Sequence, residues 1–259
     1  MPFSILAFAT FRVANMLDFN SHDLSEHLSA LVDTAMEREA AMLPPRAYLG
    51  ASSLGDDCAR RLQFQYFDTP KDIGRHFPGR VLRVFARGHR VEDWMADWLR
   101  LAGFDLRARN DQGEQHGFAA AQGRVRGHAD GVIVAGPDSF RYPMLWENKA
   151  VGAKTFRELR KKRLAASRPV YATQVALYQA YLGLYEHPAL FTAICTDDMS
   201  IYAERVTFDR GMAQRASDRA VEILRACDAA ELLPRISTTP THHTCRFCPW
   251  QDRCWSLPH

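Results

Sequence analysis

The sequence predicts an α/β (α+β) domain in which helices flank a central mixed β-sheet. Helical periodicity marks both halves of the chain, whereas the middle holds short β-branched and aromatic runs separated by Gly- and Pro-rich turns. The resulting order is helix, β-meander, two helices, two strands and helix, which suits a mixed sheet with helices packed on it. With 259 residues, 47% of them hydrophobic and 24% charged, the composition is that of an ordinary globular protein and excludes disordered and fibrous classes.

The N-terminal half is predicted to contain three helices. Residues 22–43 carry apolar positions at helical spacing, and Pro44 ends the helix. Asp56 or Asp57 is expected to cap a short helix with Cys58 in its first turn. A longer helix is predicted over 80–102, where Gly103 stops it.

The remaining elements follow in a regular order. We predict strands in FDLRAR, GRVRGHADGVIVAG and YPMLWENKA, helices at 153–163 and 169–186, strands at 189–197 and 200–208, and a helix at 209–231 before a cysteine-rich tail.

Charge and hydropathy restrict location and partners. The net charge of +3 permits an anionic partner without requiring one. No stretch approaches the roughly 18 apolar residues of a membrane span. The N-terminal apolar run lacks a basic flank and is interrupted by Arg12, so it is a poor secretory signal. We therefore expect a cytoplasmic protein, in which clustered cysteines indicate metal more than disulfides.

An acidic pair with a lysine is the most informative pattern in the middle of the chain. Asp130 lies in one predicted strand, and Glu147 and Lys149 lie two apart in the next, so these two share a face. Paired carboxylates suit Mg²⁺ or Mn²⁺, and a lysine beside them can stabilise charge on a phosphate. Taken alone, a cross-strand salt bridge on a solvated face is the commoner explanation. The preceding apolar residues 144–146 argue for a half-buried strand, where charges need partners or a metal.

Two helices add to this pattern. Glu92 lies in the helix before the sheet, within Gly88-His-Arg-Val-Glu92, and Gln174 and Tyr178 are four apart on a helix after it. Each residue alone is more often an ordinary helix residue, but their order along the chain changes the odds.

A Gly-x-x-x-Glu helix, an Asp, Glu-x-Lys and Gln-x-x-x-Tyr in this order resemble the PD-(D/E)XK nuclease superfamily, above all the RecB and AddB nuclease domains and the Cas-four exonucleases. The resemblance covers roughly residues 50–259 and implies a restriction-endonuclease-like core over 49–259, after an N-terminal extension of residues 1–48. It also implies that Glu92, Asp130, Glu147 and the backbone carbonyl of Asn148 bind the metal. Lys149 would be the catalytic lysine, and Gln174 and Tyr178 would position the active site and the DNA backbone. Close relatives often carry His where this chain has Glu92, whereas viral recombination exonucleases of the same superfamily have Glu there. His89 is a weaker candidate for the same metal-binding position.

The tail carries Cys245, Cys248 and Cys254, separated by two and five residues. Three close cysteines can clamp a metal ion or cluster, and Cys58 is the best fourth ligand. This set resembles the iron staple of the same nucleases, which implies a [4Fe–4S] cluster. A structural Zn²⁺ site, helped by the neighbouring histidines 242 and 243, is the alternative.

Two basic runs beside the acidic pattern are candidates for phosphate contacts, although each can equally be a solvated helix face. Trp250, Phe247 and Tyr171 are candidates for base stacking or for the core. The basic candidates are Arg83, Arg87 and Arg90 before the sheet, and Lys154, Arg157, Arg160 and Lys161 after it.

These observations lead us to expect a Mg²⁺- or Mn²⁺-dependent DNA nuclease, which by resemblance is an exonuclease. Its substrate would be single- or double-stranded DNA ends in recombination, repair, phage DNA metabolism or CRISPR adaptation, with a helicase, recombinase or CRISPR-adaptation partner. The alternatives are a catalytically silent or partner-activated DNA-end-binding subunit, and a zinc-stabilised protein in which the acidic pair has no catalytic role.

Overall fold

The structure is a computed structural model and describes residues 22–44 and 46–257. What the sequence predicts for residues 1–21 lies outside this range. The described residues divide into two compact units, one of residues 22–43 with Phe77–Arg83 and one of residues 44, 46–76 and 84–257.

The first unit consists of helix α1 (His22–Ala41) and the beginning of α3 (Gly79–Leu101). The two helices approach closely at Gly79, where a Cβ would collide with the Cα of Asp33. The N–H of Gly79 donates to Oε1 of Glu37 at 2.7 Å, and Arg83 pairs with Asp33. The predicted apolar face of α1 is exposed, since Leu28 and Leu31 are 58% and 56% accessible.

The second unit is built on a five-stranded sheet with the order β2-β5-β6-β7-β8. The pair β6–β7 is parallel and the other pairs are antiparallel, so the predicted central mixed sheet is confirmed. Its strands are β2 (Asp105–Arg107), β5 (Gly131–Ala135), β6 (Met144–Val151), β7 (Ala189–Cys195) and β8 (Ile201–Val206).

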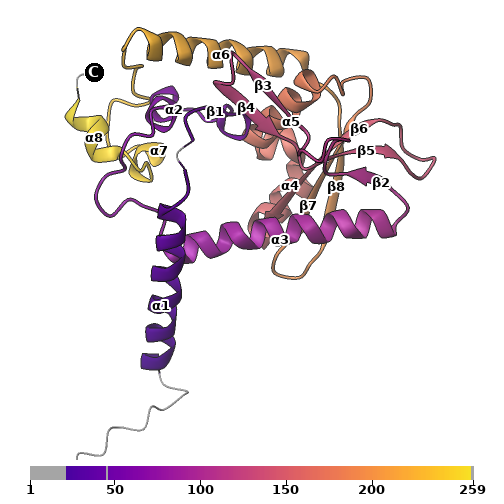
Figure 1. Cartoon of the computed structure of the whole chain (residues 1–259), viewed down its shortest axis with the longest axis horizontal. Helices are drawn as coiled ribbons and strands as arrows, with labels where there is room; N and C mark the ends of the chain where they lie inside the picture. The colour runs from indigo at the N-terminus through magenta and orange to yellow at the C-terminus, as the bar shows by residue number, and fades with distance from the viewer. Residues whose placement is uncertain (1–21, 45, 258–259) are drawn as a thin grey trace, which may run out of the picture. The chain divides into compact units, whose positions relative to one another are not determined.

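Helices cover both faces of this sheet (Figure 1). Apolar residues alternate along β6, so Met144 and Trp146 pack in one cluster with Val91 and Met95 of α3. Leu145 packs in the other cluster, against the opposite helices. Those helices are α4 (Ala153–Ser167), α5 (Pro169–Tyr181) and α6 (Arg210–Asp228).

A second, three-stranded sheet was missed at the sequence level. Its order is β1-β4-β3, with β1 (Leu49–Gly50), β3 (Gly117–Ala120) and β4 (Val125–His128). The single strand predicted around Asp130 is therefore wrong, because the chain leaves one sheet after His128 and enters the other at Gly131. Short strands of two to four residues carry too little alternation to be detected by pattern.

The cysteine-bearing segments form short helices. Cys58 is the N-cap of α2 (Ala59–Tyr66) and not a residue of its first turn; the carboxylate of Asp56 accepts the N–H of Cys58 at 2.8 Å. The tail forms α7 (His243–Arg246) and α8 (Gln251–Ser256), and the 3₁₀ helix η1 spans Ala51–Ser53. No helix in the described part of the chain has the length and apolar character needed to cross a membrane.

Candidate functional site

Asp130 is held where the β5–β6 ladder ends. The last paired residues are Gly131 and Trp146, so Asp130 comes directly before β5. Its Oδ2 accepts the N–H of Asn148 at 2.7 Å, which ties the side chain to β6 beyond the ladder. The main chain of Asp130 thus lies outside the β5–β6 ladder, while its carboxylate remains bound to β6.

Glu147 and Lys149 lie on the face of β6 that α5 covers. Glu147 is fully buried, and its Oε1 contacts Lys149 Nζ and accepts from Gln174 Nε2 at 2.6 Å. Gln174 also donates to the Tyr178 hydroxyl at 3.2 Å. The helical pair predicted from its spacing therefore does meet the strand motif.

Glu92 reaches the same group of charges from α3. Burial raises its pKa to about 7, with a further increase from the charge of Asp130 and an opposing decrease from Lys149. His89 acts on the same group, because its charge lowers the pKa of Asp130.

Burial dominates the electrostatics of all three carboxyl groups. It raises the pKa of Glu147 to about 8, reinforced by Asp130 and opposed by Lys149. It also raises the pKa of Asp130, against the charge of Lys149 and the N–H of Asn148. Burial lowers the pKa of Lys149, but the charges of Glu147 and Asp130 outweigh it, so the net change is an increase. These increases in pKa oppose ionisation of the carboxyl groups, which a bound cation would favour.

Two polar atoms of this group have no hydrogen-bond partner within the described chain. They are Glu147 Oε2 and Asn148 Nδ2, both buried. Asn148 Oδ1 accepts from Thr192 at 2.8 Å on the opposite face. Only the backbone of Asn148 is therefore near the carboxyl groups of Glu92, Asp130 and Glu147, which together form the acidic edge of this site. An orphaned carboxylate oxygen is costly unless it has a ligand.

Tyr171 contacts the lysine of this site. Lys149 Nζ lies 5.5 Å from the centre of the Tyr171 ring, within the range of a cation–π interaction. From the sequence, Tyr171 is a candidate for base stacking or for the core, but not for contact with Lys149. Its spacing of three from Gln174 is the signal that places both residues on one face.

The predicted phosphate-binding residues have different surroundings. Arg83 is engaged with Asp33 in the first unit, and Arg90 lies 3.7 Å from Asp93 at the surface. Arg87 is exposed, and so are the four predicted residues of α4, which are Lys154, Arg157, Arg160 and Lys161.

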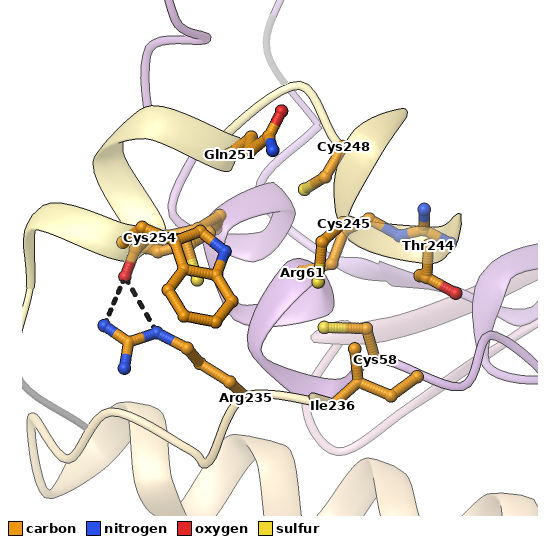
Figure 2. A pocket seen from close by; sticks show the side chains of 11 residues that line it. Cys58, Arg61, Arg235, Ile236, Thr244, Cys245, Cys248, Gln251 and Cys254 are labelled. Atoms are coloured by element: carbon orange, nitrogen blue, oxygen red, sulfur yellow. Dashed lines mark hydrogen bonds between the residues drawn. The ribbon is translucent and has the colours of Figure 1, made fainter. Parts of the chain in front are cut away.

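The four predicted cluster cysteines line one hollow, as Figure 2 shows. Burial raises the pKa of Cys58, Cys245 and Cys248, and for each the charge of another of the four adds to this increase. Cys195 and Cys227 are buried elsewhere, as expected. The histidines at 242 and 243 do not line the hollow.

Arginines surround this hollow, which the sequence analysis missed. Arg61 and Arg235 line it, and Arg61 forms an ion pair with Asp56. Arg60 is completely buried, and its Nη1 lies 3.8 Å from Cys254 Sγ. The pair Arg60-Arg61 directly follows Cys58-Ala59, which is a signal that the sequence did contain.

Neither predicted metal centre is present as a ready-made site. Across residues 22–44 and 46–257, no three His, Cys, Asp or Glu side chains are arranged so that they could hold a metal ion. The predicted [4Fe–4S] subdomain is therefore not supported by the side-chain positions.

No protein-family model and no curated protein matches this chain. Among solved structures, it is similar to an alkaline exonuclease, LHK-Exo, from Laribacter hongkongensis, with a TM-score of 0.51 and 16% identity over 72% of this chain and 90% of that chain. The structure of LHK-Exo in complex with dAMP gives a TM-score of 0.51 and 16% identity, over 71% of this chain and 89% of that one. The chain thus shares the fold of this exonuclease, a helix-flanked mixed sheet.

Proposed function

We propose that this protein is a DNA nuclease that depends on a divalent metal ion and acts at DNA ends. The observation that carries the proposal is the convergence of Asp130, Glu147 and Lys149 at one sheet edge, with Glu92 in electrostatic contact. The fold is shared with an exonuclease whose structure has been solved with dAMP, and a nucleotide is the product expected of such an enzyme.

The donor atoms of the acidic edge suit a hard divalent cation by their chemistry, although their side chains are not arranged around an ion in this structure. Carboxylate oxygens are the ligands that Mg²⁺ and Mn²⁺ prefer, and Oε2 of Glu147 is buried without a partner. In the proposal Glu92, Asp130, Glu147 and the backbone carbonyl of Asn148 hold the ion. Bound there, such an ion supplies a hydroxide nucleophile near neutral pH and offsets charge on the phosphate.

The protein's own residues have distinct functions in the proposal. Gln174 holds Oε1 of Glu147 and so fixes the direction of the carboxylate. Lys149 stays protonated because Glu147 and Asp130 raise its pKa, so its ammonium stabilises negative charge on the phosphate that is attacked. Tyr178, whose hydroxyl contacts Gln174, keeps that amide in position.

DNA would be held by the exposed basic residues of α4, with Arg87 and Arg90 of α3. Such contacts bind the backbone without reading sequence, which suits an enzyme that degrades ends. The action on ends, the partners and the cytoplasmic location are part of the proposal and rest on the resemblance.

The cysteine hollow is proposed to hold a [4Fe–4S] cluster with a structural function. Thiolates of Cys58, Cys245, Cys248 and Cys254 are the donors that such a cluster takes, and all four line the same hollow. Bound there, the cluster would join a segment before the main sheet to the tail after it. Total iron, acid-labile sulfide and zinc in anaerobically purified protein separate the cluster from the zinc alternative.

The test of the nuclease is digestion of end-labelled single- and double-stranded DNA with Mg²⁺, Mn²⁺ or EDTA. Wild type should shorten DNA only with metal, whereas Lys149→Ala and Glu147→Ala should not. Glu186→Ala removes an exposed carboxylate outside the site and is the matched control. Full cleavage by either site variant contradicts the proposal. Metal-independent DNA binding without cleavage by wild type identifies the silent or partner-activated end-binding subunit instead.

A further inference from the structure

Helix α5 presents a polar and aromatic stripe that is only partly explained by the proposed active site. Tyr171, Gln174, Tyr178 and Tyr181 follow at i, i+3, i+7 and i+10, so they share one face of the helix. Tyr171 contacts Lys149, and Gln174 contacts both Glu147 and Tyr178. Tyr181 continues the stripe beyond these contacts.

Tyr181 is stacked on an aromatic residue of the smaller sheet. Its ring and that of Phe118 on β3 are nearly parallel, at 6°, with centroids 4.1 Å apart. Phe118 also meets the ring of Tyr178 edge-on, at 6.2 Å and 70°. The rings of Tyr178, Phe118 and Tyr181 therefore form a continuous series, which begins at the tyrosine whose hydroxyl contacts Gln174.

The outer end of this path is open to solvent. Tyr181 is 41% exposed, whereas Tyr178 is 2% exposed. The Tyr181 hydroxyl is 3.2 Å from the Ser217 hydroxyl, which fixes the far edge of the ring. The stacked pair is therefore open to solvent at Tyr181, while Phe118 packs against the core.

The backbone of β4 is shaped to let these rings meet. A Cβ on Gly127 would lie 2.5 Å from Cε1 of Tyr178 and 2.6 Å from Cε1 of Phe118. Any other residue would therefore push the two rings apart. Through this close approach, the Phe118–Tyr181 pair packs against the tyrosine that contacts Gln174.

We propose that the Phe118–Tyr181 pair is a nucleobase-stacking subsite for a single-stranded segment of the nucleic acid, next to the scissile phosphate. Aromatic faces bind any base, so the subsite adds affinity without sequence preference. A base can lie on it only when it is unpaired, so the subsite favours single-stranded or frayed ends over intact duplex. The inference rests on the proposed function, since it names the substrate class of the same site.

Binding of a fluorescent single-stranded oligonucleotide, measured by anisotropy in EDTA so that no cleavage occurs, tests the subsite. Tyr181→Ala should weaken binding about ten-fold, and Tyr181→Trp should restore it. Phe118→Leu keeps an apolar side chain but removes the ring on which Tyr181 stacks, and it should weaken binding by a similar factor. Tyr185→Ala is the matched control. Tyr185 lies just after the same helix and is 53% exposed, but its ring packs against Phe208 and not against Phe118.

Oligonucleotides with one abasic position moved stepwise along the strand distinguish stacking from a loss of structure. At one position the missing base should weaken wild-type binding to the level of Tyr181→Ala, and the variant should lose nothing further. The subsite would be overturned if Tyr181→Ala weakened binding of the abasic and the intact oligonucleotide by the same factor. Unchanged affinity in Tyr181→Ala, or affinity that Tyr181→Trp does not restore, would also overturn it. A wild type that binds with this coupling but never cleaves DNA with Mg²⁺ or Mn²⁺ refutes the nuclease and supports the subsite.

Discussion

The acidic edge and the cysteine hollow are both proposed metal centres, but the protein positions them in opposite ways. The acidic groups are held together by β6, by the hydrogen bond between Asp130 and Asn148, and by α3, although burial disfavours their charges. The cysteines come from segments on either side of the main sheet, and contacts between other residues bring these segments together. Trp250 Nε1 donates to Thr69 O at 2.8 Å, and Gln63 of α2 binds the backbone of 231 and 233 at 2.8 Å.

This difference separates activity from stability in the first centre and couples the two properties in the second. A carboxylate whose pKa is raised destabilises the fold at high pH, so its removal costs function and not stability. A cluster that joins two distant segments contributes folding free energy, so its removal costs both.

The largest effect is expected from Glu92→Gln. Loss of one metal ligand should lower the cleavage rate by at least about a hundred-fold, the scale of losing one preorganised electrostatic contact in an active site. The melting temperature of the metal-free protein at pH 8 should rise, because a neutral amide replaces a carboxylate that burial and Asp130 disfavour. Calorimetry and initial rates measure the two effects. A variant that is both inactive and less stable at pH 8 would contradict the contrast between the centres.

Cys248→Ser should act on stability first. We expect loss of the bound iron and of about 2–5 kcal/mol, the range for removing a cross-link that closes a long loop. Cys227→Ser is the control, because this buried thiol does not line the hollow and its loss should leave metal content unchanged. Iron content and chemical unfolding report the outcome; a Cys248→Ser protein with its full metal content refutes the ligand assignment.

The pH dependence of the metal-free protein gives a smaller effect with a definite sign. Glu147 titrates near 4.5 when unfolded and at about 8 when folded, so the folded state binds more protons in between. Its contribution to stability is complete below pH 4.5 and is lost as pH rises toward 8. Mn²⁺ should reverse the trend by favouring the carboxylates, so stabilisation by metal should grow with pH. Equal stabilisation by Mn²⁺ at pH 5.5 and pH 8 would count against the acidic edge as the metal site.

The sequence predicted the long elements and the motif order better than the spatial arrangement. The Glu-x-Lys and Gln-x-x-x-Tyr spacings predicted shared faces correctly, because strand and helix periods fix them. The break between β4 and β5 at Asp130 was not predictable. It depends on the Asp130 side chain, which accepts a hydrogen bond from the N–H of Asn148 in β6. The arginines around the cysteines were also missed, because their proximity to Cys254 depends on how α2 meets the tail.

Asp72 offers the finest test of how the tail is held. Its two carboxylate oxygens accept the N–H groups of Asp252 at 2.6 Å and Arg253 at 3.3 Å, which caps the start of α8 from another segment. Asp72→Ala should therefore cost about 1 kcal/mol, as the loss of a helix cap does. Metal content should be unchanged, but limited proteolysis should cut the tail sooner, and Asp72→Asn, whose amide oxygen still accepts, should behave more like wild type. If Asp72→Ala also lost its iron, protein contacts and cluster would form one cooperative unit, and the cysteine hollow would depend on its scaffold as fully as the acidic edge depends on the sheet.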